Sequence, residues 1–270
     1  MREENEPISL AIIGYGKMGR EIRAAAEERG MHIVSIIDPA QEGCTPAITD
    51  ESIGDADVCL EFTTPAAVVG NIRTCARVGK NVVVGTTGWY HELAEVERIV
   101  AETGTAVLYA SNFSIGVHIF TRLVELAARL FCFHPVYDVA VHECHHAAKK
   151  DAPSGTAYRI AEAIMRNDPR KTRLRVDTPS QGVAEGELSV SSSRVGFVPG
   201  THIVMFDGPA DTVELIHRAR NRRPFADGAL MAASWIRNRK GLFTMEDMLN
   251  DIESVHGLGH GTDHAVSSGR

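Results

Sequence analysis

A glycine loop between two short apolar segments near the N-terminus constrains the fold of this chain more than any other feature. Residues 8–13 are apolar and have the length of a strand, Gly14-Tyr-Gly-Lys-Met-Gly19 follows at once, and residues 20–29 are helix formers. A second apolar segment, 32–37, ends at Asp38. A strand, a Gly-x-Gly-x-x-Gly turn, a helix, a strand and an acid form the layout of a dinucleotide-binding βαβ unit.

Each glycine of this loop has a separate physical role. Gly14 permits the tight turn, Gly16 lets the backbone approach a pyrophosphate, and Gly19 lets the helix pack closely on the strand. We therefore predict that the whole loop binds the cofactor, through Gly14, Tyr15, Gly16, Lys17, Met18 and Gly19.

The acid at the end of the second strand bears on the choice of cofactor. Asp38 lies 19 residues after Gly19, where a carboxylate accepts hydrogen bonds from an adenosine ribose. The next residue is Pro39 and not an arginine that would bind a 2′-phosphate. We expect NADH to be preferred over NADPH, although Lys17 could still reach a phosphate.

Three further apolar segments, 57–62, 81–84 and 106–109, alternate with segments of helical composition at 66–78 and 91–103. This alternation predicts a Rossmann-type, doubly wound parallel sheet. Small polar residues follow each strand, and ligands bind at the carboxyl ends of such strands. A Gly-Thr-Thr-Gly segment alone reads as a turn, but three such ends on one sheet edge favour cofactor contact. The predicted contacts are Phe62, Thr63, Gly85, Thr86, Thr87, Ser111, Asn112, Phe113 and Ser114.

The rest of the chain predicts a second domain of α+β class. Residues 116–130 form an amphipathic helical pattern, and strand patterns follow at 136–142, 188–194, 202–206 and 212–217. Three strands after a helix suggest a mixed, largely antiparallel sheet. Helices are expected at 226–237 and 244–249. The predicted divisions are a dinucleotide-binding domain (1–114), a substrate-binding and oligomerisation domain (115–222), C-terminal helices that return to the nucleotide domain (223–256) and a disordered tail (257–270).

One segment between a strand pattern and a helical pattern is rich in proton-active side chains: Glu143-Cys-His-His-Ala-Ala-Lys-Lys-Asp-Ala-Pro-Ser-Gly-Thr-Ala157. Pro153 suits a first helical turn. The backbone amides of Ser154, Gly155 and Thr156 would then form a helix N-terminus, which favours anions such as a carboxylate.

Histidine and lysine side chains surround this expected anion site. A solvated turn is the plain alternative for a single His-Lys pair, but a group of proton-active residues beside a capped helix points to a binding pocket for a small acid. That group comprises His145, His146, Lys149 and Lys150.

A metal site is the competing interpretation of the same strand, because His142, Cys144 and His146 would share one face. Residues two apart on a flat strand diverge too little to close a tetrahedron, and no fourth ligand is evident. The tail histidines His256, His260 and His264 could bind metal only adventitiously. We therefore predict no metal.

Composition excludes several other classes of function. The net charge is −7 and the pI about 5.9, so a nucleic-acid partner has no electrostatic support. No run approaches the roughly 18 apolar residues of a membrane helix. Five cysteines form no Cys-x-x-Cys pair, and the acidic N-terminus lacks a secretory signal. We expect a cytoplasmic protein with no membrane partner.

The segment 143–157 resembles the signature of the 4-hydroxy-tetrahydrodipicolinate reductase (dihydrodipicolinate reductase) family, Glu-x-His-His-x-x-Lys-x-Asp-Ala-Pro-Ser-Gly-Thr-Ala, at every fixed position. The resemblance extends from Gly14 to about Leu249. It implies NAD(P)H-dependent reduction of 4-hydroxy-tetrahydrodipicolinate to tetrahydrodipicolinate in diaminopimelate and lysine biosynthesis, by a homotetramer that associates through the second sheet. The sequence departs from the family pattern in two places: its glycine loop is one residue shorter than is common, and its segment 38–57 is short. Both departures bear on how the cofactor is bound and on the choice between NADH and NADPH, and neither involves the expected catalytic residues.

The resemblance also implies roles for single residues. His145 is the expected proton donor and acceptor, and Lys149 a second proton donor. His146, Ser154, Gly155 and Thr156 would hold the substrate. The nicotinamide and ribose would lie against Phe62-Thr63, Gly85-Thr-Thr87 and Ser111-Asn-Phe-Ser114. Lys150 lies at a variable position and receives no role, whereas Glu143 is expected to support a neighbouring His or Lys.

Two other functions are compatible with a dinucleotide-binding domain. A different nicotinamide enzyme, such as an amino-acid dehydrogenase, would need another acid-binding motif. A non-catalytic protein that senses nicotinamide dinucleotide would keep the first domain and lose the chemistry, against which the presence of His145 and Lys149 argues. A pure sensor would bind NADH without responding to a dicarboxylate analogue of the substrate.

Overall fold

The computed structural model describes residues 7–176 and 182–255 of the 270-residue chain. Of these described residues, those up to Phe113 and those from Ala226 form one compact unit, and those from Ser114 to Phe225 form a second. The predicted disordered tail and its histidines His256, His260 and His264 lie outside the described residues. Within the described residues, no helix is long and apolar enough to cross a membrane.

The first unit contains a six-stranded sheet. Its strands are β1 (Ser9–Ile13), β2 (His32–Ile37), β3 (Val58–Glu61), β4 (Asn81–Val84), β5 (Ala106–Tyr109) and β11 (Gly241–Thr244). Their order is β11-β5-β4-β3-β1-β2, and every pairing is parallel. β1, β3 and β4 are buried along their whole length, as expected for central strands covered on both faces. The predicted doubly wound parallel sheet is confirmed, and β11 is an additional strand.

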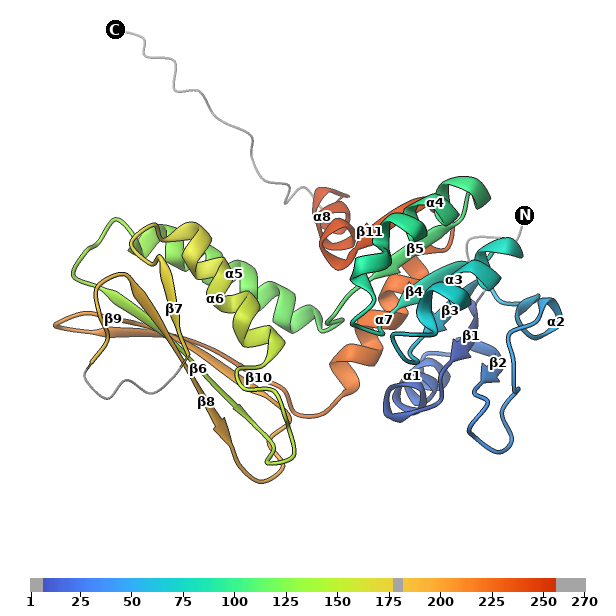
Figure 1. Cartoon of the computed structure of the whole chain (residues 1–270), viewed down its shortest axis with the longest axis horizontal. Coiled ribbons are helices and arrows are strands. Elements are labelled where there is room, and N and C mark those ends of the chain that lie inside the picture. Colours follow the sequence, from blue (N-terminus) through green and yellow to red (C-terminus); the bar gives the residue numbers. More distant parts are fainter. Residues whose placement is uncertain (1–6, 177–181, 256–270) are drawn as a thin grey trace, which may run out of the picture. The chain divides into compact units, whose positions relative to one another are not determined.

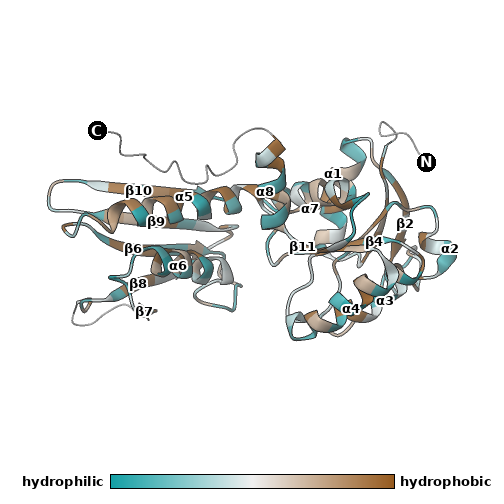
Figure 2. Ribbon diagram, turned by 90° about the horizontal axis from the view of Figure 1, so that it is seen from above, coloured by the Kyte–Doolittle hydropathy of each residue, from teal (hydrophilic) through white to brown (hydrophobic). Residues whose placement is uncertain are grey.

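Helices connect these strands and cover the sheet (Figure 1). They are α1 (Lys17–Glu28), α2 (Asp50–Ile53), α3 (Val68–Arg77), η1 (Tyr90–Glu92), α4 (Leu93–Thr103), α7 (Arg223–Ile236) and α8 (Met245–Val255). Several of them, such as α3 and α4, carry both hydrophobic and hydrophilic residues, as amphipathic helices do (Figure 2). Ile72 of α3 and Val96 of α4 are completely buried in one core together with Trp89.

The second unit contains a five-stranded sheet covered by two helices. The strands are β6 (Asp138–His145), β7 (Arg173–Arg175), β8 (Glu187–Arg194), β9 (Thr201–Asp207) and β10 (Thr212–Arg218), in the order β10-β9-β6-β8-β7. Two pairings are antiparallel and two are parallel, so the predicted mixed sheet is confirmed, but its strand pairings are not largely antiparallel. The helices α5 (Ile115–Phe131) and α6 (Gly155–Asn167) lie side by side on one face (Figure 1).

Two local predictions around the signature segment need correction. The strand expected at 136–142 starts at Asp138 and continues to His145, because β8 pairs with it as far as His145↔Arg194 and β9 as far as Cys144↔Thr201. Pro153 precedes the cap of α6 and does not lie in its first turn, since Ser154 is the N-cap and Gly155 the first helical residue.

Candidate functional site

A cleft of about 480 Å³ opens in the first unit, at the carboxyl ends of β1, β3 and β4. Parallel α/β sheets bind their ligands at this edge. Eight of the predicted cofactor-binding residues line the cleft, and Pro65 lines it as well, although it was not predicted. The lining residues are Gly16, Lys17, Met18, Phe62, Thr63, Pro65, Gly85, Thr86 and Thr87.

Glycines shape this cleft because larger residues would not fit. A Cβ atom on Gly14 would lie 2.3 Å from the Phe62 carbonyl oxygen, and one on Gly19 would lie 2.1 Å from the Gly14 carbonyl oxygen. Gly14 also has a φ of +92°, which other residues rarely adopt. A Cβ on Gly85 would penetrate the Phe62 ring. By contrast, a Cβ on Gly16 would meet nothing within 4 Å, so the backbone at the start of α1 stays open toward the cleft. This arrangement fits the pyrophosphate of a dinucleotide.

Asp38 lies beside the glycine loop, as its position at the end of β2 predicts. Its two carboxylate oxygens accept hydrogen bonds from the backbone amides of Tyr15, at 2.8 Å, and Ala40, at 2.9 Å. The guanidinium of Arg20 lies 4.6 Å from the centre of the Tyr15 ring and donates a hydrogen bond to Gln41 at 2.7 Å. The sequence motif did not identify Arg20, which adds a positive charge close to the loop.

Glu61 is a buried acid beside the cleft that the sequence did not single out. It ends β3 with no exposed surface, and its carboxyl group is hydrogen-bonded to the Thr63 hydroxyl and to Asn71 at 3.0 Å. The Thr63 amide in turn donates to the Thr86 hydroxyl at 2.8 Å. Burial raises the pKa of Glu61. The available signal was a charged residue at the end of an otherwise apolar strand.

The segment predicted to complete the cofactor site, Ser111 to Ser114, does not line the cleft. Asn112, Phe113 and Ser114 are buried, and the rings of Phe113 and Phe62 are 5.9 Å apart. Ser114 is the N-cap of α5, where its hydroxyl accepts a hydrogen bond from the Val117 amide. This segment therefore meets the lining of the cleft where Phe113 packs against Phe62.

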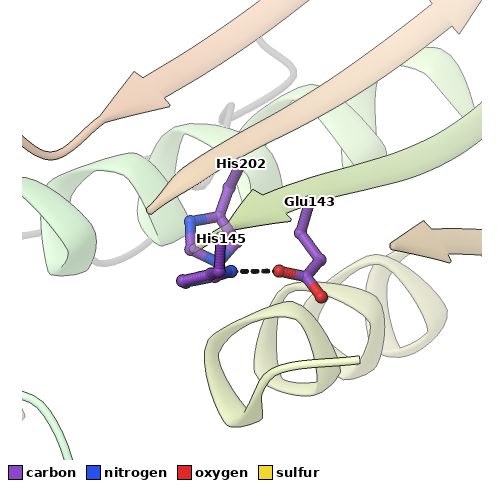
Figure 3. A group of neighbouring side chains, drawn as sticks. All are labelled: Glu143, His145 and His202. Carbon is purple, nitrogen blue, oxygen red and sulfur yellow. Dashed lines mark hydrogen bonds and ion pairs between the residues drawn. The ribbon is translucent and has the colours of Figure 1, made fainter. Parts of the chain in front are cut away.

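The second candidate site lies in the second unit, at the carboxyl end of β6. Glu143 and His145 are two residues apart on this strand, so both side chains project from the same face. Glu143 is completely buried and His145 is 8% exposed. One Glu143 oxygen bonds to Nδ1 of His145 (Figure 3) and the other accepts from Arg194 at 2.7 Å. The carboxylate therefore orients the imidazole and leaves its Nε2 atom available.

Burial and charge set the protonation of this pair. Burial lowers the pKa of His145, an effect that the adjacent Glu143 carboxylate opposes. Burial also acts to raise the pKa of Glu143, but Arg194 and His145 outweigh it and the pKa is held below its usual value. Glu143 is thus a buried carboxylate with a permanent cation at one oxygen and a titratable ring at the other.

Lys149 lies in the loop after β6. The chain turns at Ala147 and Ala148, and the Lys149 amide donates to the His146 carbonyl at 3.0 Å. The Lys149 ammonium contacts both carboxylate oxygens of Asp151, at 2.7 and 2.9 Å, and this pairing lowers the pKa of Asp151. His146 is half-buried at the start of the turn.

The N-terminus of α6 completes the second site. The Ser154 hydroxyl accepts a hydrogen bond from the Ala157 amide at 3.2 Å and lies 3.3 Å from Nε2 of His202. The rings of His202 and His145 are 5.3 Å apart, edge to face. Burial lowers the pKa of His202 to about 4, so this ring is neutral near pH 7. His202, on β9, was not predicted, because its only signal was one histidine in an alternating strand.

Glu143, His145 and His202 also place three possible metal ligands within 4.8 Å of one another (Figure 3). Each group already has a partner, however: Glu143 binds Arg194, His145 binds Glu143, and His202 contacts Ser154. A guanidinium on the carboxylate also repels a cation. The three groups fit a hydrogen-bonded proton-transfer site better than a metal site. Of the ligand set considered from the sequence, His142 pairs with Ser191 at 2.8 Å and lies on the face of β6 opposite to Glu143 and His145.

Comparison with known proteins gives a consistent result for both units. The family model for dihydrodipicolinate reductase, N-terminus, matches residues 8–113, and the model for its C-terminus matches residues 116–249. A 4-hydroxy-tetrahydrodipicolinate reductase of Christiangramia forsetii is 35% identical over 245 residues, which are 91% of this chain and 99% of that protein. One of Archaeoglobus fulgidus is 36% identical over 262 residues, 89% of this chain and 99% of that protein.

Solved structures agree with these relatives. A dipicolinate-bound dihydrodipicolinate reductase from a Paenisporosarcina species has a TM-score of 0.72 and 26% identity, over 88% of this chain and 98% of that one. The resemblance read from residues 143–157 is thereby confirmed. With both halves matched by the family models and relatives aligned over nearly their whole length, the chain belongs to the dihydrodipicolinate reductase family.

Proposed function

We propose that this protein reduces 4-hydroxy-tetrahydrodipicolinate to tetrahydrodipicolinate in the diaminopimelate route to lysine. The observation that carries the proposal is the buried Glu143–His145 pair, with Lys149 in the adjoining loop and the N-terminus of α6 close by. The relatives bear the name of this activity, and a related structure holds dipicolinate, a ring with two carboxylates. A proton donor and a carboxylate-binding helix end are what such a substrate requires.

The substrate loses water to give a conjugated imine, which accepts a hydride at C4 and a proton. Reduced nicotinamide supplies the hydride when it is bound in the cleft of the first unit. Nε2 of His145 delivers the proton, because Glu143 holds the opposite ring nitrogen. Lys149 acts as a second proton donor and neutralises negative charge. These two residues are the proposed catalytic residues.

The same loop and helix would hold the substrate. A carboxylate is favoured at the positive end of α6, next to the Ser154 cap and the amides of Gly155 and Thr156. His146 adds a further hydrogen-bond donor at the start of the turn. Hydride transfer needs the cofactor and the substrate in contact, and we propose that domain closure brings them together.

For the cofactor, we propose that NADH is preferred and that NADPH is also used. The carboxylate of Asp38, held beside the glycine loop by Tyr15 and Ala40, suits the two hydroxyls of a ribose and repels a 2′-phosphate. Lys17 in the cleft and Arg20 near Tyr15 supply positive charge that keeps NADPH acceptable.

We also propose a homotetramer that assembles through the second sheet. The face of this sheet away from α5 and α6 carries apolar side chains, because residues that alternate with the buried core of β9 and β10 point outward. Ile203, Met205 and Ile216 lie on that face, and Ile216 is 37% exposed. The five cysteines are free thiols, which supports the proposed location in the cytoplasm.

The decisive experiment supplies the substrate in place with the preceding synthase and follows oxidation of NADH and NADPH in parallel. Substrate-dependent turnover, faster with NADH, is the expected result. Cofactor binding without any turnover would refute the proposed activity and favour a sensor. Thermal-shift titration with dipicolinate gives an independent reading, because a pure sensor does not respond to it.

A further inference from the structure

Arg194 has an unusual position for a residue with no role in the proposed reaction. It ends β8 and pairs directly with His145 at the end of β6, so two neighbouring parallel strands finish together. Its side chain is 18% exposed and lies between the strand ends and the loop after β6. A long cationic side chain that is mostly buried needs acceptors for its donors.

The first acceptor is the carboxylate that holds His145. A terminal nitrogen of Arg194 donates to Glu143 at 2.7 Å, and Glu143 bonds with its other oxygen to Nδ1 of His145. Because Glu143 is completely buried, its charge depends on this guanidinium for compensation. Without Arg194, the buried carboxylate of Glu143 would bind another cation or take up a proton. Either change would alter its bond to Nδ1 of His145 and so the orientation of that ring.

The second set of acceptors lies on the backbone. The same terminal nitrogen donates to the carbonyl of Asp151, and the other donates to the carbonyl of Ser193 at 2.7 Å. Asp151 in turn accepts two contacts from the Lys149 ammonium through its carboxylate. One guanidinium therefore contacts the partner of His145 and the residue that holds Lys149.

We propose that Arg194 is a positioning residue for the reduction, which fixes His145 through Glu143 and Lys149 through the loop at Asp151. The inference rests on the roles proposed above for His145 and Lys149. The planar fork of arginine matches acceptors in several directions, whereas a lysine at this position offers one compact charge. A misplacement of about 1 Å at a reacting group can lower a rate by about a hundredfold.

The test compares wild type, Arg194→Ala, Arg194→Lys and the control Arg173→Ala. Arg173 lies on the neighbouring strand β7, 66% exposed, with an ion pair to Glu187 at 3.6 Å. We expect Arg194→Ala to lose between about tenfold and a hundredfold in kcat with a smaller change in KM. Arg194→Lys recovers part of the loss, and the control keeps wild-type kcat. Guanidinium chloride at non-denaturing concentrations restores Arg194→Ala, and sodium chloride of equal ionic strength does not.

A purely structural role predicts a different pattern, in which thermal stability and the amount of folded protein fall while kcat per folded molecule is unchanged. That pattern, or a loss in KM alone, would overturn the proposal. A second measurement is independent of turnover. Nitrogen-15 spectra of labelled histidines identify which ring nitrogen of His145 carries the proton, with His145→Gln as the assignment control. Wild type shows the Nδ1–H form, and Arg194→Ala shows a mixture.

If wild type lacks turnover, the proposed function fails, and the histidine spectra still decide whether Arg194 orients His145. An unchanged Nδ1–H form in folded Arg194→Ala would refute the positioning role even in an active enzyme.

Discussion

The orientation of the His145 side chain depends on where β6 ends. The strand reaches His145 before the chain turns, so Glu143 and His145 face the same way and one can bond the other. A strand that stopped at residue 142, as the apolar pattern predicts, would not define this geometry. At the scale of single residues, the structure thus shows that two members of the motif, Glu143 and His145, are bonded to each other.

Replacement of His145 by alanine tests its role as proton donor. We expect kcat to fall on the order of a hundredfold or more, with a modest change in KM, because a general acid acts mainly in the transition state. His142→Ala is the matched control, since His142 lies on the same strand but faces Ser191 on the opposite side. Steady-state kinetics with NADH measure both, and unchanged turnover in His145→Ala would remove the residue from the mechanism.

Replacement of Glu143 by glutamine tests how the pKa of His145 is set. The titratable and charged groups around His145 are Glu143 on its own strand, His202 on β9, Arg194 on β8 and Lys149 in the loop. Glu143 raises the pKa of His145, whereas burial, Lys149 and Arg194 lower it.

The direction of the expected change follows from these charges. Without the carboxylate, the pKa of His145 falls further, and the protonated donor is lost at lower pH. The decline of kcat/KM on the alkaline side should therefore move to lower pH, as measured between about pH 5 and pH 8. A shift to higher pH, or none, contradicts the assigned interaction.

At the scale of secondary-structure elements, each site depends on the start of one helix. Gly16 caps α1 without a side chain, which leaves its first amides open to the cleft, whereas Ser154 caps α6 with its hydroxyl. Helix N-termini carry a partial positive charge, so both positions suit anionic ligands. We therefore expect these two helix N-termini to bind the anionic groups of the cofactor and of the substrate.

The cap of α6 can be tested by replacing Ser154 with alanine. Loss of the cap should lower stability by about 1 kcal/mol. It should also raise KM for the substrate, because the hydroxyl orders the first turn of α6 and contacts His202. Thr49→Ala is the control: Thr49 caps α2 in the first unit with a comparable hydrogen bond. It should lose stability without any change in substrate KM, as thermal unfolding and kinetics can show.

The proposed contact between the βαβ unit and the cofactor ribose can be tested by replacing Asp38 with alanine. Alanine at this position removes the carboxylate that favours a ribose with two free hydroxyls and repels a 2′-phosphate. The ratio of kcat/KM for NADH to that for NADPH should fall toward one, chiefly because KM for NADH rises. If both cofactors kept their kinetic constants, the ribose assignment would be incorrect.

At the scale of the whole molecule, each sheet has a different environment. In the part of the chain that the structure describes, helices bury the first sheet on both faces, whereas α5 and α6 cover the second sheet on one face. A sheet with an apolar open face requires a partner to shield it from water. We therefore expect the second sheet to carry the assembly of this protein.

An aspartate in place of Ile216 tests this expectation. A charge on the open face opposes its burial, so the variant should form smaller species than wild type in light scattering coupled to size exclusion. Ile119→Asp is the matched control, because Ile119 is 50% exposed on α5, and this variant should assemble normally. If Ile216→Asp assembled normally and Ile119→Asp formed smaller species, the interface would lie on the helices and not on the sheet.

Local patterns in the sequence were sufficient for much of this molecule. The parallel sheet follows from apolar segments that alternate with helices, and the family resemblance follows from residues 143–157, which the comparisons confirm. The strands β7 and β11 were missed, because β7 has one apolar residue between two arginines and β11 has only two apolar residues after a glycine. The cofactor contacts predicted at Ser111 to Ser114 remain a prediction, and the structure adds that Phe113 packs against Phe62 and that Ser114 caps α5.

What the sequence by itself determined is the set of elements and motifs whose residues are neighbours along the chain: the glycine loop, the strand ends and the His-Lys segment before a capped helix. What only the tertiary structure decided is which distant residues complete them. Arg194 lies 51 residues from Glu143, and His202 lies 48 residues from Ser154. Their contacts exist because β8 and β9 flank β6 in a particular register. Strand register depends on the packing of a whole face against α5 and α6, and no local pattern contains that information.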